Sequence, residues 1–381
     1  PVKTRQGVRD AVNDLLPQII DTVVVDISSL WDPITGRVNL AIPIEMNTRT
    51  TDALQMSATG LYPITIGLQQ GKTVVSQLVT FVERLGAKLT TPNTQDDLRV
   101  ALIGSLDGDV TRQSDSSTLI SNNDRASIAQ TIASLEDLPT TPITLAIRPE
   151  FIEGLDRSTL EDGDLLTRLQ STQSLNILSN TYVDVDQALS DQSESIFTDQ
   201  LRLGEDTLRL LLPTYKATRD IWFQQTPLFS GGAQILRNLG IRNIVMLREG
   251  SQGAKGADTD RPPTGLVELQ LPDGGVIDAA FVDIKLSAAL TRGSQNPRGG
   301  AYLVAQQILA ELKMLRSELT TNDFSTSDHG VILSTDFGAL PSTAMLTALR
   351  TTLNANSAIT FVSLGDLLST MTHEVKDGSR L

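Results

Sequence analysis

A short stretch in the middle of the chain carries the side chains best suited to chemistry. Tyr182, Asp184 and Asp186 follow an apolar run that ends at Ser179, and they precede a pattern that predicts an amphipathic helix. A buried strand that releases acids and an aromatic residue into the loop before a helix is how (β/α) barrels build their working face. Asp184 is therefore a candidate for catalysis, whereas Asp186 is also placed to cap the helix.

Polar residues follow the other predicted strands in the same way, so parallel strands would collect them on one rim. Carboxylates, amides, an arginine and a tryptophan are typical of carbohydrate sites. Two carboxylates can hydrolyse a glycosidic bond as acid and as nucleophile or base. We assign Asp184 and Glu150 as the candidate catalytic residues. The candidate binding residues are Tyr182, Asp186, Arg148, Trp222, Gln225, Asp107 and Asp336.

A plainer interpretation exists for many of these residues. An aspartate after a strand commonly caps the next helix, and this interpretation applies to Asp124, Asp186 and Asp366. Trp222 fits either a protein core or a stacking surface for a ligand. An all-oxygen Ca²⁺ or Mg²⁺ site at residues 107–109 or 184–186 is a further alternative, but we assign no metal and no cofactor.

The histidine and cysteine content excludes several classes of hydrolase. The chain has two histidines, His329 and His373, and we expect both at the surface. They cannot supply a histidine-based zinc site, and no Gly-x-Ser-x-Gly motif is present for a serine nucleophile. The chain has no cysteine, which excludes thiolate chemistry, disulfides and cysteine-ligated metals.

Apolar runs that alternate with helical patterns predict a parallel sheet in the larger part of the chain. Strands are predicted at residues 98–104, 143–147, 176–179, 220–223, 243–247, 276–284, 331–333 and 359–362. Helices are predicted between them at residues 124–135, 160–169, 197–212, 233–239, 299–319 and 343–353. Such alternation favours an α/β fold with a (β/α) barrel-like domain of seven or eight strands. An open, doubly wound sheet is the alternative.

The first 92 residues have a different rhythm, with a short helical pattern at 8–16 followed by β-type runs. Strands are predicted at residues 22–28, 38–44, 61–68 and 73–82, the last two as a hairpin. Four strands suggest a small β-sandwich-like domain. Either further strands are expected before Pro1, or this layer packs on the neighbouring domain. The predicted domains are therefore residues 1–92 and residues 93–381.

Two segments, residues 249–265 and 291–300, lack periodicity and follow predicted strands. Loops of this kind above a barrel rim are lids in some enzymes and tolerated insertions in others.

The charge balance limits the possible partners. The 31 Lys and Arg residues against 45 Asp and Glu residues give a formal net charge of −14. Nucleic acid and anionic membrane surfaces are therefore poor partners. No apolar run is long enough to span a bilayer. The start at Pro1 without a methionine suggests a processed chain whose leader or anchor is missing.

Several short motifs occur in an order that resembles a known family. They are Gly60-Leu-Tyr-Pro-Ile-Thr-Ile66, Thr144-Leu-Ala-Ile-Arg-Pro-Glu150, Tyr182-Val-Asp-Val-Asp-Gln-Ala-Leu189, the Trp222 strand and Ala310-Glu-Leu312. Over nearly its whole length the chain resembles a secreted or membrane-anchored actinobacterial family of unknown function (the DUF6049 type). The genes of that family often neighbour the gene of the lipid II flippase MurJ. The resemblance implies β-domains, a barrel reminiscent of glycoside hydrolases and deacetylases, and a membrane anchor outside this chain.

The resemblance also implies an extracytoplasmic location and assigns the tyrosine–acid–acid element of the family to Tyr182, Asp184 and Asp186. Relatives often carry an acid where this chain has Arg148, and a Trp-Pro or acidic element where it has Trp222-Phe-Gln-Gln225. We therefore expect a non-catalytic envelope protein. Its rim would bind a cell-wall glycan or a cell-wall assembly membrane protein such as the flippase. The alternatives are an active glycoside hydrolase with a rim carboxylate pair, and a scaffold that acts through the β-domain.

Overall fold

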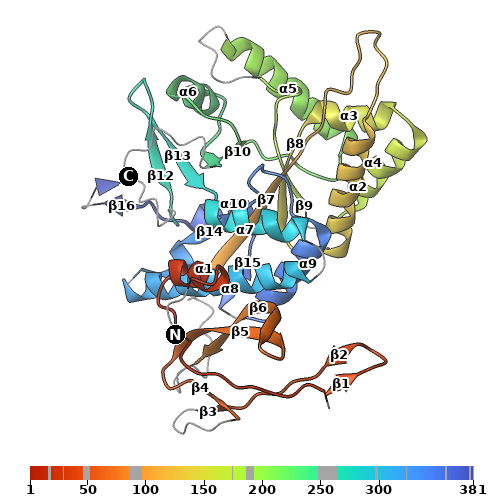
Figure 1. Ribbon diagram of the computed structural model, residues 1–381. Helices are drawn as coiled ribbons and strands as arrows, with labels where there is room; N and C mark the ends of the chain where they lie inside the picture. The colour runs from red at the N-terminus through yellow and green to blue at the C-terminus, as the bar shows by residue number, and fades with distance from the viewer. Residues whose placement is uncertain are drawn as a thin grey trace. The chain divides into compact units, whose positions relative to one another are not determined.

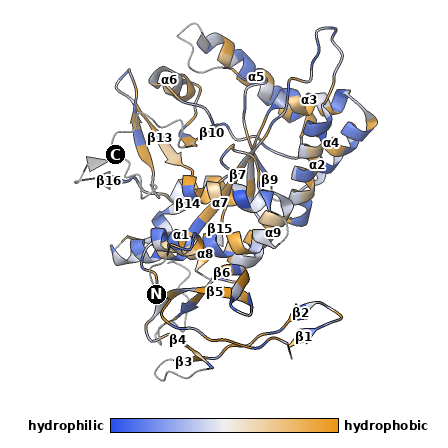
Figure 2. Ribbon diagram, viewed as in Figure 1, coloured by the Kyte–Doolittle hydropathy of each residue, from blue (hydrophilic) through white to orange (hydrophobic). Residues whose placement is uncertain are grey.

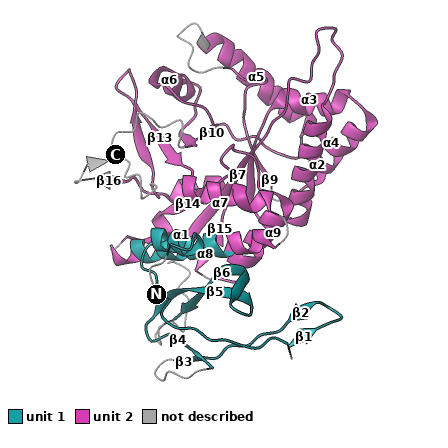
Figure 3. Cartoon of the chain, in the orientation of Figure 1, with its two compact units in different colours: residues 1–92, 306–318 teal, residues 93–305, 319–381 magenta. Residues whose placement is uncertain are grey.

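The chain forms two compact units in a computed structural model (Figure 3). Unit 1 consists of residues 1–92 and 306–318, and unit 2 of residues 93–305 and 319–381. The structure describes residues 1–15, 19–28, 30–45, 52–85, 97–173, 175–185, 193–247, 264–296, 299–322, 324–356, 358–376 and 379–380.

Seven parallel strands form the centre of unit 2 (Figure 1). They are β7 (Leu98–Leu106), β8 (Ile143–Ile147), β9 (Leu175–Leu178), β10 (Ile221–Gln224), β11 (Asn243–Met246), β13 (Val276–Phe281) and β14 (Gly330–Leu333). Hydrogen bonding joins them into two parallel groups, β14-β7-β8-β9 and β10-β11-β13. Isolated parallel bridges connect the groups at both ends, from Leu178 to Thr218 and from Val282 to Ile332. The strands therefore follow one another around a ring in chain order, and the sheet curls into a barrel-like form.

The interior of this ring is a packed core. Each of the seven strands contributes buried residues to one hydrophobic cluster, among them Ala101, Ala146, Leu178, Phe223, Val245, Ala280 and Ile332. Leucines of the short helix α10 (Leu364–Thr370) belong to the same cluster. A Cβ atom on Gly330, the first residue of β14, would lie 2.2 Å from Cδ1 of Leu367. Helix α10 therefore packs at the N-terminal ends of the strands, opposite the rim where a site is expected.

Helices connect the strands of the ring. They are α2 (Asn122–Asp137), α3 (Pro149–Arg157), α4 (Leu160–Ser171), α5 (Ser193–Leu211), α6 (Ser230–Asn238), α7 (Ile284–Gln295), α8 (Gly300–Thr321) and α9 (Thr343–Asn354). Figure 2 shows hydrophilic and hydrophobic residues mixed along α2, α3 and α4, as amphipathic covering helices require. The sequence patterns missed α3 and α7, which begin immediately after a strand with hardly any loop to mark them.

The eighth predicted strand does not enter the ring. Strand β15 (Ile359–Phe361) pairs with Leu98–Val100 of β7, whereas β8 pairs with Leu102–Leu106 along the same edge of β7. Strand β7 is longer than β8, so its first residues would otherwise lack partners, and β15 supplies their hydrogen bonds. An antiparallel strand, β12 (Val267–Gln270), extends the other group beside β13.

Unit 1 contains one long hairpin, formed by β5 (Gly60–Gln70) and β6 (Thr73–Arg84) as the sequence predicted. Helix α1 (Arg5–Val12) begins at Thr4, whose side chain accepts a hydrogen bond from the N–H of Gly7. Val8, Leu61, Ala310 and Met314 form the core of the unit. The carboxylate of Glu311 is fully buried and pairs with Arg5 and Arg9.

The predicted β-sandwich is not confirmed by unit 1. The described residues 22–28 form no strand. In the described parts of the next segment, residues 30–45 and 52–55, strands occur only as two-residue pairs: β1 (Trp31–Asp32) with β2 (Arg37–Val38), and β3 (Ile44–Glu45) with β4 (Leu54–Gln55). Val24, Ile34 and Leu40 are exposed. These apolar residues have the composition of strands but no facing sheet, so composition alone was misleading.

The remaining described elements are a short turn and a two-residue strand pair. A 3₁₀ turn (Thr326–Asp328) precedes β14, and β16 (Val375–Lys376) pairs with β17 (Ser379–Arg380) near the end. The predicted rim loop at 291–300 is corrected in part, because residues 291–295 belong to α7. Residues 249–263 of the other predicted loop lie outside the described residues. Among the described helices, none is both long and apolar enough to cross a membrane.

Candidate functional site

An arginine ties two predicted site residues together at the C-terminal ends of β7, β8 and β9. Arg148 precedes Pro149, which starts helix α3 and keeps Arg148 in an extended conformation. Its Nε lies 2.7 Å from Oδ1 of Asp107, and its Nη2 donates to Oδ2 of Asp107 at 2.8 Å. The same Nη2 also donates to Asp184. Both carboxylates therefore share one guanidinium, which neutralises part of their charge.

The two carboxylates differ in their surroundings. The side chain of Asp184 is 73% exposed, whereas that of Asp107 is 39% exposed. Burial raises the pKa of the Asp107 carboxyl above its usual value. Arg148 opposes the increase, and the negative charge of Asp184 adds to it. Asp107 is therefore the described rim acid best suited to hold a proton.

Glu150, the second candidate for catalysis, is a buried residue that organises a loop. Its Oε1 accepts hydrogen bonds from the N–H and hydroxyl of Thr111, at 3.0 and 2.6 Å, and from the N–H of Arg112 at 3.0 Å. The residue is 2% exposed. These contacts fix the loop between β7 and α2, so Glu150 helps to position the rim through its buried Oε1.

Tyr182 lies beside α3 and donates its hydroxyl proton to the carboxylate of Glu153. Burial and this hydrogen bond raise the pKa of Tyr182. Its carbonyl oxygen accepts the N–H of Glu150 at 3.1 Å. Tyr182 is therefore a neutral, half-buried link between the segment after β9 and α3. Asp186, which was predicted in the same stretch, lies outside the described residues.

A cavity of about 290 Å³ opens at the rim between the ends of β7, β10 and β14. Most of its described lining is polar or small. It includes Ser105, Asp107, Ser127, Gln130, Thr131, Ser134, Gln225, Phe337 and Ala339. Two of the predicted binding residues, Asp107 and Gln225, thus line one cavity. Asp107 is the carboxylate among its described lining residues.

Gln225 is held by Ser105 of β7 and by the loop after the neighbouring strand β14. Its Nε2 donates to Oγ of Ser105 at 2.9 Å and to the carbonyl of Phe337 at 3.4 Å. The loop after β14 approaches closely at Gly338, where φ is +76° and a Cβ atom would lie 2.0 Å from Nε2 of Gln225. The positive φ favours glycine there, and an added methyl group would displace the Gln225 amide.

Trp222 does not reach the cavity. It is 5% exposed and packs in the outer core cluster, where its ring centroid lies 5.5 Å from that of Phe197. Its Nε1 donates to Oε1 of Gln224 at 2.8 Å. Side chains alternate along a strand. Trp222 and Gln224 therefore face the helices, while Gln225 after the strand turns to the rim.

The loop after β14 holds Asp336 and an aromatic residue that the sequence patterns missed. Asp336 is exposed, and its N–H donates to Oγ1 of Thr291 at 3.0 Å. Phe337 follows it, is 81% exposed and lines the cavity. No periodic pattern covers this loop, so only the position after a predicted strand could have drawn attention to Phe337.

Three further polar residues behave differently from their predictions. Asp124 and Asp366 lie in the first turns of α2 and α10, but Ser121 and Ser363 are the caps, and their hydroxyls accept the N–H groups of these aspartates. His329 is not a surface residue: it is 5% exposed, and its Nδ1 lies 3.0 Å from Oγ1 of Thr264. The short turn before β14 carries it inward.

The structural relatives are carbohydrate-active enzymes. No protein-family model and no curated protein sequence matches the chain. The α-amylase AmyC from Thermotoga maritima aligns with a TM-score of 0.55 and 10% identity, over 74% of this chain and 76% of that one. At this identity the likeness establishes the fold alone, as a glycoside hydrolase type of barrel.

Two other relatives are less similar in structure. A 4-α-glucanotransferase from Thermococcus litoralis has a TM-score of 0.48 and 16% identity, over 72% of this chain and 41% of that one. A protein from Mycobacterium smegmatis that is assigned as a polysaccharide deacetylase has a TM-score of 0.44 and 13% identity, over 78% of this chain and 99% of that one. The chain spans less than half of the glucanotransferase's length.

Proposed function

We propose that the rim cavity binds a glycan without hydrolysing it. The observation that carries the proposal is the cavity itself, whose lining combines hydroxyl, amide and carboxylate groups with the exposed ring of Phe337. Sugars present hydroxyl groups that pair with such donors and acceptors, and C–H faces that pack on aromatic rings. The barrel fold and its carbohydrate-active neighbours are consistent with this ligand class.

The arrangement of acids favours binding over catalysis. Glycoside hydrolysis uses two carboxyl groups that flank the scissile bond, one as acid and one as nucleophile or base. Here Arg148 engages both Asp107 and Asp184, Glu150 is committed to the Thr111 loop, and an amide, Gln225, lines the cavity beside Ser105. With both carboxylates held on one guanidinium, Asp107 is the carboxyl group among the described lining residues of the cavity, so these residues provide no acid and nucleophile pair there.

The place of action we propose is the outer side of the cytoplasmic membrane, with the full-length protein anchored there. The sequence resemblance supports this location. It also supports a cell-wall glycan as the ligand, or a cell-wall assembly membrane protein such as the lipid II flippase as the partner.

Calorimetric titration of defined glycans tests the proposal. Peptidoglycan glycan fragments and maltooligosaccharides are titrated into the wild type, Phe337→Ala and Phe229→Ala. Phe229 is the matched control, because it is also exposed, at 60%, but does not line the cavity. We expect one class of glycan to bind, Phe337→Ala to weaken it about tenfold, and Phe229→Ala to leave it unchanged. Absence of binding to every glycan, or equal effects of both variants, would contradict the proposal.

The raised pKa of Asp107 favours one second candidate, an active glycoside hydrolase. A carboxyl group that keeps its proton at higher pH is suited to general-acid catalysis. Product analysis of the same glycans decides between the two. Release of shorter sugars by the wild type, with a loss of about 100-fold or more in Asp107→Asn, would establish hydrolysis. Binding without release supports the non-catalytic function.

A further inference from the structure

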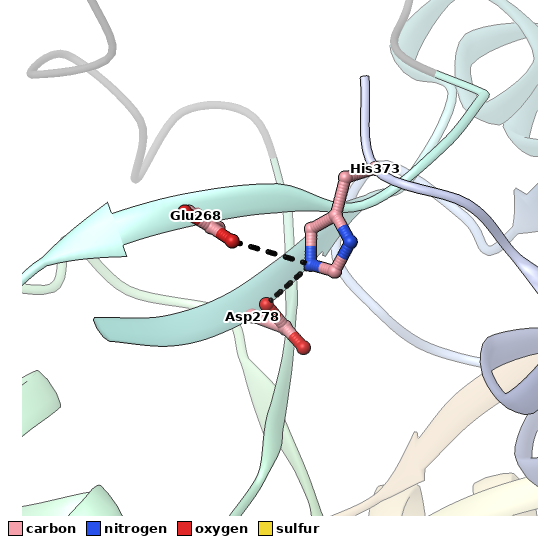
Figure 4. Close-up of side chains that lie close together, drawn as sticks. All are labelled: Glu268, Asp278 and His373. Atoms are coloured by element: carbon pink, nitrogen blue, oxygen red, sulfur yellow. Dashed lines mark hydrogen bonds and ion pairs between the residues drawn. The ribbon is translucent and has the colours of Figure 1, made fainter. Parts of the chain in front are cut away.

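A second cluster of ionisable side chains lies away from the rim of unit 2. Glu268 of β12, Asp278 of β13 and His373, in the segment after α10, point toward one another (Figure 4). Asp278 pairs in register with Asn243, the first residue of β11. The cluster therefore lies near the N-terminal ends of the strands, whereas the rim cavity lies at their C-terminal ends.

The geometry suits a cation. Nε2 of His373 lies 2.9 Å from Oδ1 of Asp278 and 3.8 Å from Oε1 of Glu268. One ligand atom of each residue lies within 4.8 Å of the others. All three side chains are partly buried, at 24% exposure for His373, 18% for Glu268 and 33% for Asp278.

The strand pairing brings two carboxylates together at this point. Glu268 and Asp278 are direct cross-strand partners in the antiparallel pair β12–β13, so their side chains lie on the same face. Two carboxylates directly opposite each other destabilise a sheet, and a cation between them would offset this repulsion. With a neutral imidazole, the three groups carry a charge of −2, which matches a divalent ion.

The backbone around each ligand is fixed. Leu266, two residues before Glu268, forms a parallel bridge with His373, and it exchanges hydrogen bonds of 2.8 Å with Thr372 and Glu374. Oε1 of Glu374 also accepts the N–H groups of Thr264 and Gly265, each at 2.9 Å. The backbone hydrogen bonds therefore hold His373 next to the two carboxylates. Ion binding would require little further ordering of the chain.

We propose that Glu268, Asp278 and His373 bind a divalent transition-metal cation. One imidazole and two carboxylates suit Zn²⁺, Mn²⁺ and related ions better than Ca²⁺ or Mg²⁺, which prefer oxygen ligands alone. Three protein ligands leave at least one coordination position for water or a ligand. The cation would also join the β12–β13 hairpin to the chain segment after α10.

Titration of Zn²⁺ into the full chain, followed by NMR of the imidazole nitrogens, tests this site. The chain has only two histidines, so each gives a separate set of signals. Buried His329 serves as the internal control. At about pH 7.5, where an ordinary imidazole is neutral, we expect one equivalent of Zn²⁺ to shift Nε2 of His373 and leave His329 unchanged. Mg²⁺ should produce no such shift.

Variants complete the test. Asp278→Asn and His373→Gln should weaken Zn²⁺ binding about 100-fold or more in calorimetric titration. Phe337→Ala, at the rim, should leave it unchanged. Zn²⁺ that fails to bind, or that binds with the His373 signals unmoved, would overturn the proposal and leave a histidine–carboxylate ion pair as the role of the cluster. This result does not depend on glycan binding at the rim.

Discussion

At the scale of single residues, Arg148 determines the character of the rim. Nε and Nη2 of its guanidinium both contact Asp107, and Nη2 also donates to Asp184. A planar group with several donors in fixed directions can hold two carboxylates in this way, whereas lysine cannot. In the proposed binding function, the shared arginine positions both carboxylates as part of a polar surface.

Removal of the guanidinium should raise the pKa of Asp107 further. Burial in the folded state already raises the pKa of Asp107. The contribution of Asp107 to stability is therefore fully present below its unfolded pKa, and it is lost as pH rises through the folded pKa. In Arg148→Met the opposing charge disappears and the increase grows. Carboxyl ¹³C NMR titration measures the change. Asp115, whose pKa is lowered by hydrogen bonds from Ser117, is the control and should not move. A lower pKa for Asp107 in the variant would contradict the assignment.

Asp162 should contribute strongly to the stability of unit 2. Burial opposes its ionisation, but hydrogen bonds from Arg125 and Thr159 prevail and lower its pKa to about 2. It also completes the capping box of α4. We expect Asp162→Ala to lower the free energy of unfolding by about 3 kcal/mol at neutral pH, because it leaves Arg125 without its partner.

The pH dependence of that loss follows from the lowered pKa. The contribution of Asp162 is complete above its unfolded pKa, about 4, and fades as pH falls toward 2. Denaturation curves of the wild type and variant should therefore converge in acid. Glu136→Ala is the matched control, because Glu136 and Arg168 form an exposed pair that is worth under about 1 kcal/mol. Equal losses in both variants would disprove the special role of Asp162.

At the scale of elements, the loop after β14 lines part of the rim cavity. Gly338→Ala should lower stability by about 1 kcal/mol, because alanine is strained at a positive φ. It should also weaken glycan binding, since the new methyl group displaces the amide of Gln225. Gly274→Ala is the control: its φ is +80°, but nothing lies within 4 Å of the added atom. Calorimetry should find weaker binding in the first variant alone, and loss in both would refute the link to Gln225.

The sequence identified the seven ring strands because each is a short, continuous apolar run between amphipathic patterns. The outer position of Trp222 could not be predicted. A continuous apolar run does not show which of its side chains face the interior of the ring and which face the helices. Phe337 was missed because no periodicity marks a loop. The Glu268–Asp278–His373 cluster was missed because only the register of β12 and β13 makes neighbours of residues distant in sequence.

At the scale of the whole molecule, unit 1 is discontinuous in sequence. Residues 306–318 complete it, with Ala310 and Met314 in its core and Glu311 between Arg5 and Arg9. A fragment of residues 93–381 should therefore aggregate, because it exposes this apolar surface and leaves Glu311 without its arginines. Size-exclusion chromatography measures the outcome. Met314→Gln combined with Glu311→Gln should improve the solubility of the fragment, and a monodisperse wild-type fragment would contradict the argument.

The single bridges that complete the ring have a consequence for its motions. Within each parallel group, ladders of several hydrogen bonds hold the strands, but at Leu178–Thr218 and Val282–Ile332 one bridge spans each junction. Such junctions open at a lower free energy than the ladders beside them. Amide hydrogens at the two seams should exchange with solvent well before those inside β7 or β11, as mass spectrometry can measure. The two parallel groups would then separate transiently at these junctions. A bulky ligand could enter through the gap while the hydrogen bonds within each group stay intact.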